Sequence, residues 1–360
     1  AALRRPGSTP AGAARPARSA GAPKRGGAAA RARGRQMDTN PVEYWDAQAR
    51  DYDGNIFSTI DEDVTGIITE TLDRHAHARG TGPFSRCIDL GCGAGKYLAA
   101  LSARFGTVVA YDLSPKLVRL AQNEVRGRGL SNVEVGVRDL SQVWYRDSSQ
   151  AAGNPFGDCA EMGSFGFAVM ANVLIAPVES SVRALMLRNA WRSLCPGGHL
   201  LVVVPSLESA LYVNMRCDET GCEGPYDGGG GHRVVPGCPP ADTLRQPSKA
   251  EGSDLLRGVF KRSGVRTKHF LEPEFRVLAA RTGFEVDACE KVAYSWRSEL
   301  DLDSDAQVPS SLRGPQGDPL PWDWLFVLRK PAPLAPAALD SPVPRSAGDP
   351  GGHARALTAR

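Results

Sequence analysis

Asp89-Leu90-Gly91-Cys92-Gly93-Ala94-Gly95 is the stretch of sequence that decides the fold. It follows the apolar pair Cys87-Ile88 and precedes a segment, 96–105, with the composition of a helix, so it predicts a strand, a glycine turn and a helix. Three glycines at alternate positions let the backbone approach a ligand closely, because no Cβ atom stands in the way. Asp89 is expected to point into the same crevice. A tight turn that binds nothing is the simpler explanation of the same residues.

Two other glycine motifs do not fit this stretch. The dinucleotide-binding fingerprint G-x-G-x-x-G requires a glycine where the chain has Lys96. The phosphate-binding pattern G-x-x-x-x-G-K-[ST] finds Gly95 followed by Lys96, but Leu90 stands at its first glycine and Tyr97 at its hydroxyl position. The turn is therefore not predicted to bind a dinucleotide or a nucleoside triphosphate.

Two later strand-like runs also end in an acidic residue. The first, 107–112, ends in Asp112, which lies 21 residues after Gly91. In a doubly wound sheet the ends of the first two strands lie side by side, so this carboxylate can accept both hydroxyls of a ribose. NAD enzymes use the same arrangement, and Asp112 also suits a helix cap ahead of Ser114. The second run, 132–140, contains Asp139, which suits either an adenine amino group or the turn that follows the strand.

In this order and spacing, these residues resemble the class I S-adenosylmethionine-dependent methyltransferases. The resemblance runs from about residue 40 to 330 and includes the run 167–174 and a Pro-Gly-Gly turn at 196–198 ahead of the fifth strand. S-adenosylmethionine has a cationic end and a flat apolar end, as an acidic, glycine-lined crevice requires. The resemblance implies this cofactor and the following cofactor-binding residues: Asp89, Gly91, Cys92, Gly93, Gly95, Asp112, Leu113, Asp139 and Asn172.

The alternation of apolar strands with helical segments predicts an α/β fold. We expect a doubly wound, seven-stranded, mostly parallel, Rossmann-like sheet, and the resemblance implies an antiparallel last strand between the fifth and sixth. Two N-terminal helices, one opening at 40–45 and one at 61–79, are expected to form a lid. A long insertion, 206–268, follows strand five. Further helices are predicted at 115–126, 179–194 and 273–282, and closing strands at 284–294 and 324–328.

The reaction implied by the resemblance is transfer of a methyl group from a sulfonium to a nucleophile. Alignment supplies much of such catalysis, so a catalytic dyad is not required. His269 and Asn172 are the candidate catalytic residues, although a lone histidine is more often structural. The sequence after strand four, Ala171 to Leu174, lacks the motifs of DNA-base methylation, and only Glu179 is placed as in arginine methylation. We therefore expect a small-molecule acceptor.

Two other classes of function stay open. One is a non-catalytic partner subunit that binds S-adenosylmethionine and uses the 206–268 insertion as a docking surface. The other is an NAD-dependent oxidoreductase, against which the failed fingerprint and Asp89 both count. The oligomeric state does not follow from the sequence.

Charge and composition divide the chain into three parts. Residues 1–36 contain nine Lys or Arg and no acid, as transit peptides do, and are expected to be disordered. They predict an organellar location, a plastid rather than a mitochondrion, or a cytoplasmic one if translation starts at Met37. A basic RNA-binding tail is the weaker alternative. Residues 37–330 form the methyltransferase domain, and the Pro/Ala-rich 331–360 are expected to be a disordered tail.

The partners of the central domain follow from its charge and its cysteines. The chain has 43 basic residues, of which nine lie in 1–36, so residues 37–360 contain 34 basic and 40 acidic residues. No nucleic-acid-binding face is therefore expected. No apolar run approaches the length that crosses a membrane. No metal site is expected either, since the spacings of Cys217, Cys222, His232 and Cys238 match no zinc template.

Overall fold

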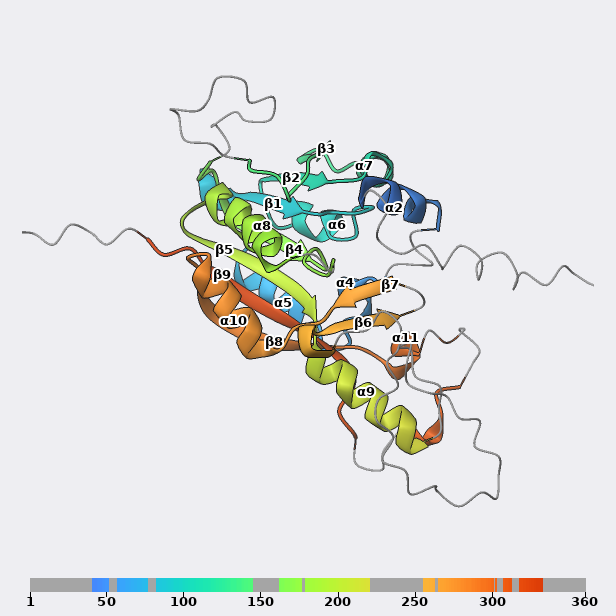
Figure 1. Ribbon diagram of the computed structural model, residues 1–360. Helices are drawn as coiled ribbons and strands as arrows, with labels where there is room; N and C mark the ends of the chain where they lie inside the picture. The colour runs from blue at the N-terminus through green and yellow to red at the C-terminus, as the bar shows by residue number, and fades with distance from the viewer. Residues whose placement is uncertain are drawn as a thin grey trace, which may run out of the picture.

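The computed structural model describes residues 41–51, 57–76, 82–144, 162–176, 179–220, 255–262, 265–300, 302, 307–312 and 317–332 (Figure 1). The expected disordered segment 1–36, and nearly all of the expected tail 331–360, lie outside these residues.

A seven-stranded sheet organises the described chain, in the order β3-β2-β1-β4-β5-β9-β8 (Figure 1). The strands β1 to β5 are parallel to one another, and β9 runs antiparallel between β5 and β8. This confirms the predicted doubly wound sheet with its reversed last strand. The strands are β1 (Arg86–Leu90), β2 (Thr107–Asp112), β3 (Val133–Val137), β4 (Phe165–Ala171), β5 (Leu194–Pro205), β8 (Glu285–Ala293) and β9 (Trp322–Arg329).

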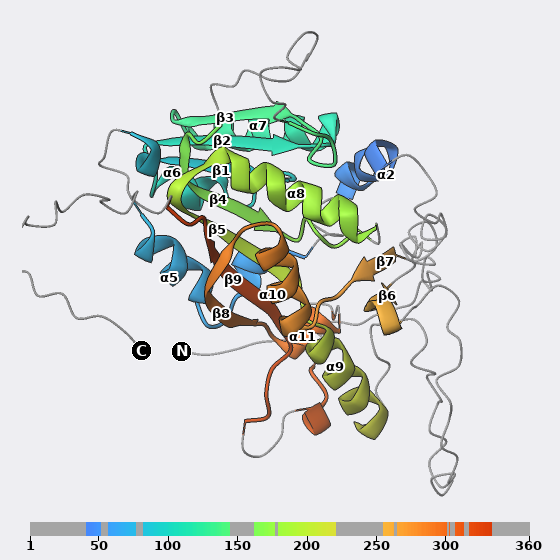
Figure 2. The same cartoon turned by 60° about the vertical axis from the view of Figure 1, so that its left-hand side comes forward.

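Helices cover both faces of this sheet (Figure 2). One face packs against α8 and α10, and the other packs against α5, α6 and α7. The helices are α2 (Pro41–Gln48), α4 (Thr59–Glu62), α5 (Ile67–Arg74), α6 (Leu98–Ser102), α7 (Pro115–Arg128), α8 (Ser180–Ser193), α9 (Leu207–Thr220), α10 (Glu272–Arg281) and α11 (Trp296–Glu299), with short 3-10 turns at Ala49–Asp51, Pro83–Ser85, Leu255–Arg257 and Ser310–Leu312.

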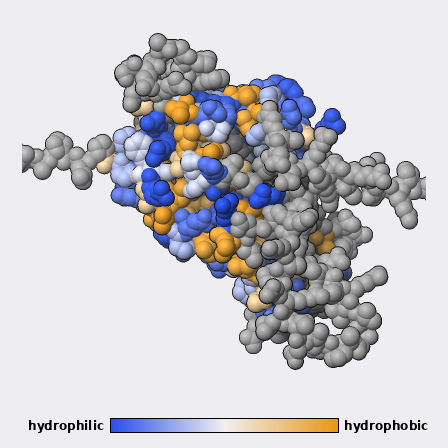
Figure 3. All heavy atoms as spheres, viewed as in Figure 1, coloured by the Kyte–Doolittle hydropathy of each residue, from blue (hydrophilic) through white to orange (hydrophobic). Residues whose placement is uncertain are grey.

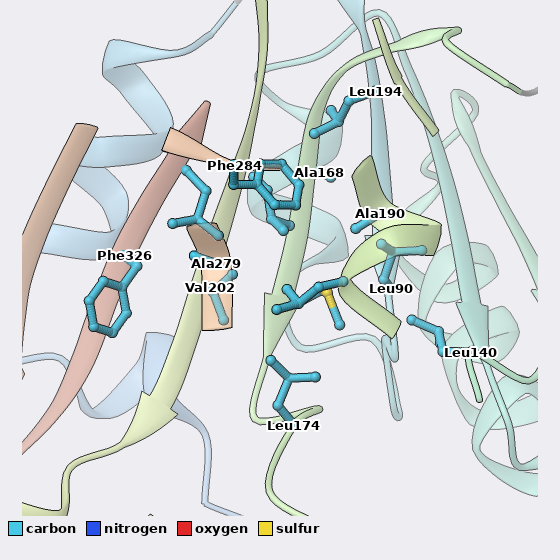
Figure 4. Packing of buried hydrophobic residues seen from close by; sticks show 14 of the residues in the cluster. Leu90, Leu140, Ala168, Leu174, Ala190, Leu194, Val202, Ala279, Phe284 and Phe326 are labelled. Carbon is cyan, nitrogen blue, oxygen red and sulfur yellow. The ribbon is translucent and has the colours of Figure 1, made fainter. Parts of the chain in front are cut away.

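The core lies on the two faces of the central strands. Six of the seven residues of β4 are buried, as expected of a parallel strand with helices on both sides. Alternate residues of each strand enter different clusters: Ala168 and Val202 face α8 and α10 (Figure 4), whereas Val169 and Val203 face α5 and α6. This packing fixes the carboxyl ends of β1, β2 and β4 along one edge of the sheet.

The predicted helix at 61–79 is wrong in extent and in role. The chain forms two short helices, α4 and α5, because the carboxylate of Asp63 accepts hydrogen bonds from the backbone N–H groups of Thr65, Gly66 and Ile68 and so opens a new helix. Ile68 and Leu72 of α5 are fully buried against the sheet, so α5 belongs to the helical layer and not to a lid.

Two other predicted boundaries differ from the structure. The helix expected at 96–105 is only α6, since the glycine turn continues through Tyr97. The Pro-Gly-Gly turn lies within β5, where the pairing with β4 shifts register between Phe165 and Phe167. Here Gly197 has a φ of 79°, and its N–H donates to the carbonyl of Lys330.

The insertion after β5 has more structure than its composition predicts. It begins with α9 and returns through an antiparallel hairpin of β6 (Val259–Arg262) and β7 (Val265–Lys268), neither strand of which the sequence analysis predicts. It rejoins the sheet beside its starting point, where Ser206 bridges Phe270. Its middle, 221–254, which includes Cys222, His232 and Cys238, lies outside the described residues.

Hydrophilic and hydrophobic residues are interspersed over the described part of the face in Figure 3. None of the helices in the described ranges combines the length and the apolar character that crossing a membrane requires. Within the same ranges, His, Cys, Asp and Glu side chains form no group of three or more that could hold a metal ion.

Candidate functional site

The glycine turn after β1 is held against the end of β2. The N–H groups of Gly91 and Cys92 both donate to the carbonyl of Tyr111, at 2.7 and 3.0 Å. Gly91 and Gly95 have φ values of 83° and 96°, which side chains other than glycine rarely adopt. A Cβ atom on Gly91 would lie 2.5 Å from Cγ2 of Val173, so the turn also lies directly against the loop after β4. The carboxyl ends of β1, β2 and β4 therefore meet at this turn.

Asp112 joins this turn to the end of β2. Its Oδ2 accepts from the Gly93 N–H at 2.8 Å and its Oδ1 from the Ser114 N–H at 2.9 Å. The helix-capping role left open by the sequence falls to Ser114, whose hydroxyl accepts from the Leu117 N–H. Burial raises the pKa of Asp112, while the hydrogen bonds from Ser114, Gly93 and Leu113 oppose that rise. The carboxylate is thus a structural link between the glycine turn and the end of β2.

Asp89 is the most unusual group of the site. It is 3% exposed, and its Oδ2 has no hydrogen-bond partner. Burial, together with the neighbouring charge of Asp112, raises the pKa of Asp89 to about 7. A buried carboxylate without a partner costs stability unless something compensates it. The geometry suits a ligand that brings a cationic group or a hydrogen-bond donor to this oxygen.

Asn172 follows β4 in a strained conformation. Its φ of 54° is the only positive value of a non-glycine residue in the described chain. Its N–H donates to the carbonyl of Val203, and its side-chain Oδ1 is buried without a hydrogen-bond partner. Strained residues with unmet polar groups cluster at functional sites, where the surrounding structure holds them in place. Asn172 therefore remains, like Asp89, a candidate functional residue.

The strain at Asn172 can be measured directly. Alanine at a φ of 54° costs about 1–2 kcal/mol, whereas glycine adopts this conformation freely. We therefore expect Asn172→Ala to lower the free energy of unfolding by about 1 kcal/mol and Asn172→Gly to leave it nearly unchanged. Urea denaturation followed by circular dichroism measures both. Equal losses from the two substitutions would show that the amide, and not the backbone, stabilises this position.

Asp139 and Leu113 lie at the ends of β3 and β2. The Oδ1 of Asp139 accepts from the N–H and the hydroxyl of Ser141, both at 2.7 Å, so its carboxylate closes its own turn. Its carbonyl accepts from the indole N–H of Trp144. Leu113 is half-buried next to Asp112. These contacts match the turn role that the sequence left open for Asp139, and Leu113 stays adjacent to the crevice.

His269 lies beneath the β6–β7 hairpin, beside the return of the insertion. It is 5% exposed, its N–H donates to the carbonyl of Gly258, and its ring packs edge-on against Phe260. The ring Nδ1 lies 3.1 Å from the carbonyl oxygen of Thr267. Because a carbonyl only accepts, this contact assigns the proton of a neutral ring to Nδ1 and the lone pair to Nε2.

Two contacts near the glycine turn were missed by the sequence analysis. The hydroxyl of Tyr97 is hydrogen-bonded to that of Thr59 at 2.7 Å, which ties α4 to the glycine turn. The carboxylate of Asp46 on α2 accepts from the hydroxyl of Ser114 and from the Lys116 N–H. No local pattern in the sequence marks either pair, since each joins segments that are far apart in the chain.

Comparison with known proteins finds similarity to methyltransferases. Residues 87–198 match a family model described as a methyltransferase domain. Among solved structures, the chain is similar to an S-adenosylmethionine-dependent methyltransferase from Methanosarcina mazei, with 19% identity, 69% of this chain and 93% of the other covered, and a TM-score of 0.40. An S-adenosylmethionine-dependent methyltransferase from Mesorhizobium loti is 16% identical, with 75% of this chain and 99% of the other covered and a TM-score of 0.44. Another, from Aquifex aeolicus, is 14% identical, with 79% of this chain and 98% of the other covered and a TM-score of 0.41.

Proposed function

We propose that this chain, which carries a methyltransferase domain of the class I, Rossmann-like type over residues 87–198, transfers a methyl group from S-adenosylmethionine to a small-molecule acceptor. The observation that carries the proposal is the buried carboxylate of Asp89, which has an oxygen without a partner at the start of a glycine turn. A ligand with a cationic amino-acid end supplies what this oxygen lacks.

The described residues fit S-adenosylmethionine on three counts. Asp89 offers a buried oxygen to a cation, and Asn172 offers a second buried oxygen without a partner. The turn at Gly91 leaves no room for a side chain, as a close backbone approach requires. Asp112 lies at the end of β2 beside the glycine turn, and its two carboxylate oxygens are acceptors that suit the two hydroxyls of a ribose.

The cofactor, when bound, supplies an electrophilic methyl group. The part of the protein in the reaction is then to bind, to orient and to exclude water, since an aligned pair of reactants needs little further assistance. Asp89 would hold the amino-acid end of the cofactor and Asp112 its ribose. Asn172 lies at the exit of β4, next to Val173 and the glycine turn. His269, with its lone pair on Nε2, is the group we assign to take a proton from the acceptor.

A small-molecule acceptor is supported by sequence features. The residues from the end of β4 onward, Ala171 to Leu174, lack the motifs with which this class methylates DNA bases. Residues 37–360 also contain more acidic than basic side chains. Nucleic-acid substrates normally require clustered basic side chains.

The first experiment is isothermal titration calorimetry of the full chain with S-adenosylmethionine, S-adenosylhomocysteine and NAD. We expect micromolar binding of the first two ligands and no binding of NAD. Binding of NAD alone would replace the proposal with an oxidoreductase. Binding of S-adenosylmethionine without turnover in a broad acceptor screen would favour a non-catalytic partner subunit.

The affinity for the cofactor is expected to depend on pH through Asp89. Since the pKa of this buried carboxyl is raised to about 7, it is mostly protonated below that pH and must lose its proton to pair with a cation. The dissociation constant should therefore fall about tenfold per pH unit between pH 5 and 7 and level off above it. Calorimetry in buffers of different ionisation enthalpy should show proton release in this range.

Asp89→Asn is the control for this prediction, because it keeps the shape of the side chain and removes the titrating proton. The variant should bind the cofactor more weakly and show no change of affinity between pH 5 and 7, a range that lies below the pKa of a free α-amino group at about 7.7–8.0. A pH dependence that persists in Asp89→Asn would assign the titration to another group.

A further inference from the structure

We propose that Arg183 is a positioning residue for Asn172, because its guanidinium fixes the far end of the loop 172–176 that follows β4. The inference rests on the proposed function, since it assigns to Asn172 a contact with the cofactor. Arg183 was not among the residues predicted from the sequence.

Arg183 lies on the first turn of α8 and is 9% exposed. Its Nη1 donates to the carbonyl of Ala176 at 3.2 Å. A guanidinium is always charged and is costly to bury, so a buried one needs partners that are fixed in place. In this position Arg183 holds the loop from the side of α8.

The same loop is held from the side of β7. The backbone N–H of Lys268 donates to the carbonyl of Ile175 at 2.8 Å. The Nζ of Lys268, whose side chain is 3% exposed, forms an ion pair with Glu274 at 2.7 Å. Neighbouring carbonyls of the loop are thus bound by two different elements of the fold.

Glu274 and Phe270 join the two cations into one cluster. Glu274 on α10 attracts both Lys268 and Arg183. The Nζ of Lys268 lies 4.7 Å from the centre of the Phe270 ring, and the guanidinium carbon of Arg183 lies 5.9 Å from the same centre. Cation–π contacts of this kind add to the ion pair. The cluster therefore couples α8, α10 and β7 around the loop.

This clamp explains how Asn172 keeps its conformation. A non-glycine residue in a sparsely populated backbone conformation costs about 1–3 kcal/mol and persists only where its surroundings determine it. The front of the loop is determined by the contact of Val173 with Gly91 and by the bond from the Asn172 N–H to Val203. Its rear is determined by Arg183 and Lys268. Release of the rear should free the amide oxygen of Asn172 from its place in the crevice.

A double-mutant cycle tests the inference in the full chain. The variants are Arg183→Met, Arg183→Lys, Asn172→Gly and the pair Arg183→Met with Asn172→Gly. Arg188→Met is the matched control, since it removes the same charge from an exposed position of the same helix. Calorimetry gives the dissociation constant for S-adenosylmethionine, thermal denaturation gives the stability, and hydrogen exchange reports on residues 172–176 without any ligand.

We expect Arg183→Met to weaken binding about five- to tenfold, as the loss of one ordinary hydrogen bond does, and to speed exchange in 172–176. Arg183→Lys should recover most of the affinity, and Arg188→Met should match the parent protein. Since Arg183 acts through Asn172, the double variant should bind no more weakly than Asn172→Gly alone. Multiplied losses in the double variant, or unchanged affinity and exchange in Arg183→Met, would overturn the inference.

Failure of this inference and failure of the proposed function give different results. If Arg183→Met does not fold, Glu274→Gln serves in its place, because Glu274 has a 43% exposed side chain and holds the same cluster; normal affinity and exchange in that folded variant would also count against the inference. If the parent protein does not bind S-adenosylmethionine, the proposed function fails. The exchange rates of 172–176 still decide whether Arg183 holds the loop.

Discussion

Asp112→Ala is expected to weaken the binding of S-adenosylmethionine about a hundredfold. A hydrogen bond to a charged carboxylate contributes about 1.5–3 kcal/mol, and we propose that this side chain accepts from the ribose of the cofactor. The substitution also removes the acceptor that the N–H groups of Gly93 and Ser114 now use, so the glycine turn loses one of its links to β2. Calorimetry of the purified variant measures the loss.

Asp73→Ala is the matched control for this effect. Asp73 is also a carboxylate, with a 61% exposed side chain, and it pairs with Arg104 on the helical layer. An exposed ion pair contributes about 0–1 kcal/mol, so binding and stability should change little. A loss of less than threefold in Asp112→Ala would contradict the assignment of Asp112 to the cofactor and leave it a purely structural link.

Gly91→Ala is expected to destabilise the protein strongly, although it adds only one methyl group. The new Cβ would lie 2.5 Å from Cγ2 of Val173, at a φ of 83° that alanine rarely adopts. Left-handed backbone costs about 1–2 kcal/mol and overpacking adds about 1–3 kcal/mol, so the free energy of unfolding should fall by about 2–5 kcal/mol. Cofactor binding should be lost as well, because Val173 and its neighbour Asn172 must move.

Two further substitutions separate the causes of this loss. Gly129→Ala meets the same conformational cost at a φ of 65°, but no atom lies within 4 Å of its Cβ, so it should cost only about 1–2 kcal/mol and leave binding intact. Adding Val173→Ala to Gly91→Ala removes the clash and should restore part of the stability. If Gly91→Ala and Gly129→Ala destabilise the protein equally, steric contact between the two loops is not the reason.

Those parts of the fold that depend on short contiguous patterns could be predicted from the sequence. The predicted strand 107–112 matches β2 at both ends. The apolar run ends at an acid, and Ser114-Pro115 marks the start of the next helix, so the end of the strand is well defined. The glycine turn and its link to Asp112 were also predictable, since an alternating run of glycines can serve few other purposes. The reversed last strand came only from the resemblance to the methyltransferases.

Contacts that depend on how the backbone folds were not predicted from the sequence. Whether Asp63 continues a helix or caps a new one depends on which backbone N–H groups its carboxylate reaches. Arg183 looks like any charged residue near the start of an amphipathic helix, and only the folded chain shows that its guanidinium meets Ala176. The β6–β7 hairpin was missed although the Ser-Gly dipeptide at 263–264, between its two strands, is a turn signal in the sequence.

The return of the chain at Phe270 has a consequence for how such a protein diversifies. The segment from Ser206 to Phe270 leaves and rejoins the sheet at one point, where the N–H of Leu207 donates to the carbonyl of Phe270 and that of Phe270 to Pro205. Doubling the length of a closed loop costs only about 0.6 kcal/mol. The part of the segment that precedes Lys268 is therefore an exchangeable cassette: recombination can lengthen, shorten or replace it while the sheet, Lys268 and the candidate cofactor site stay as they are.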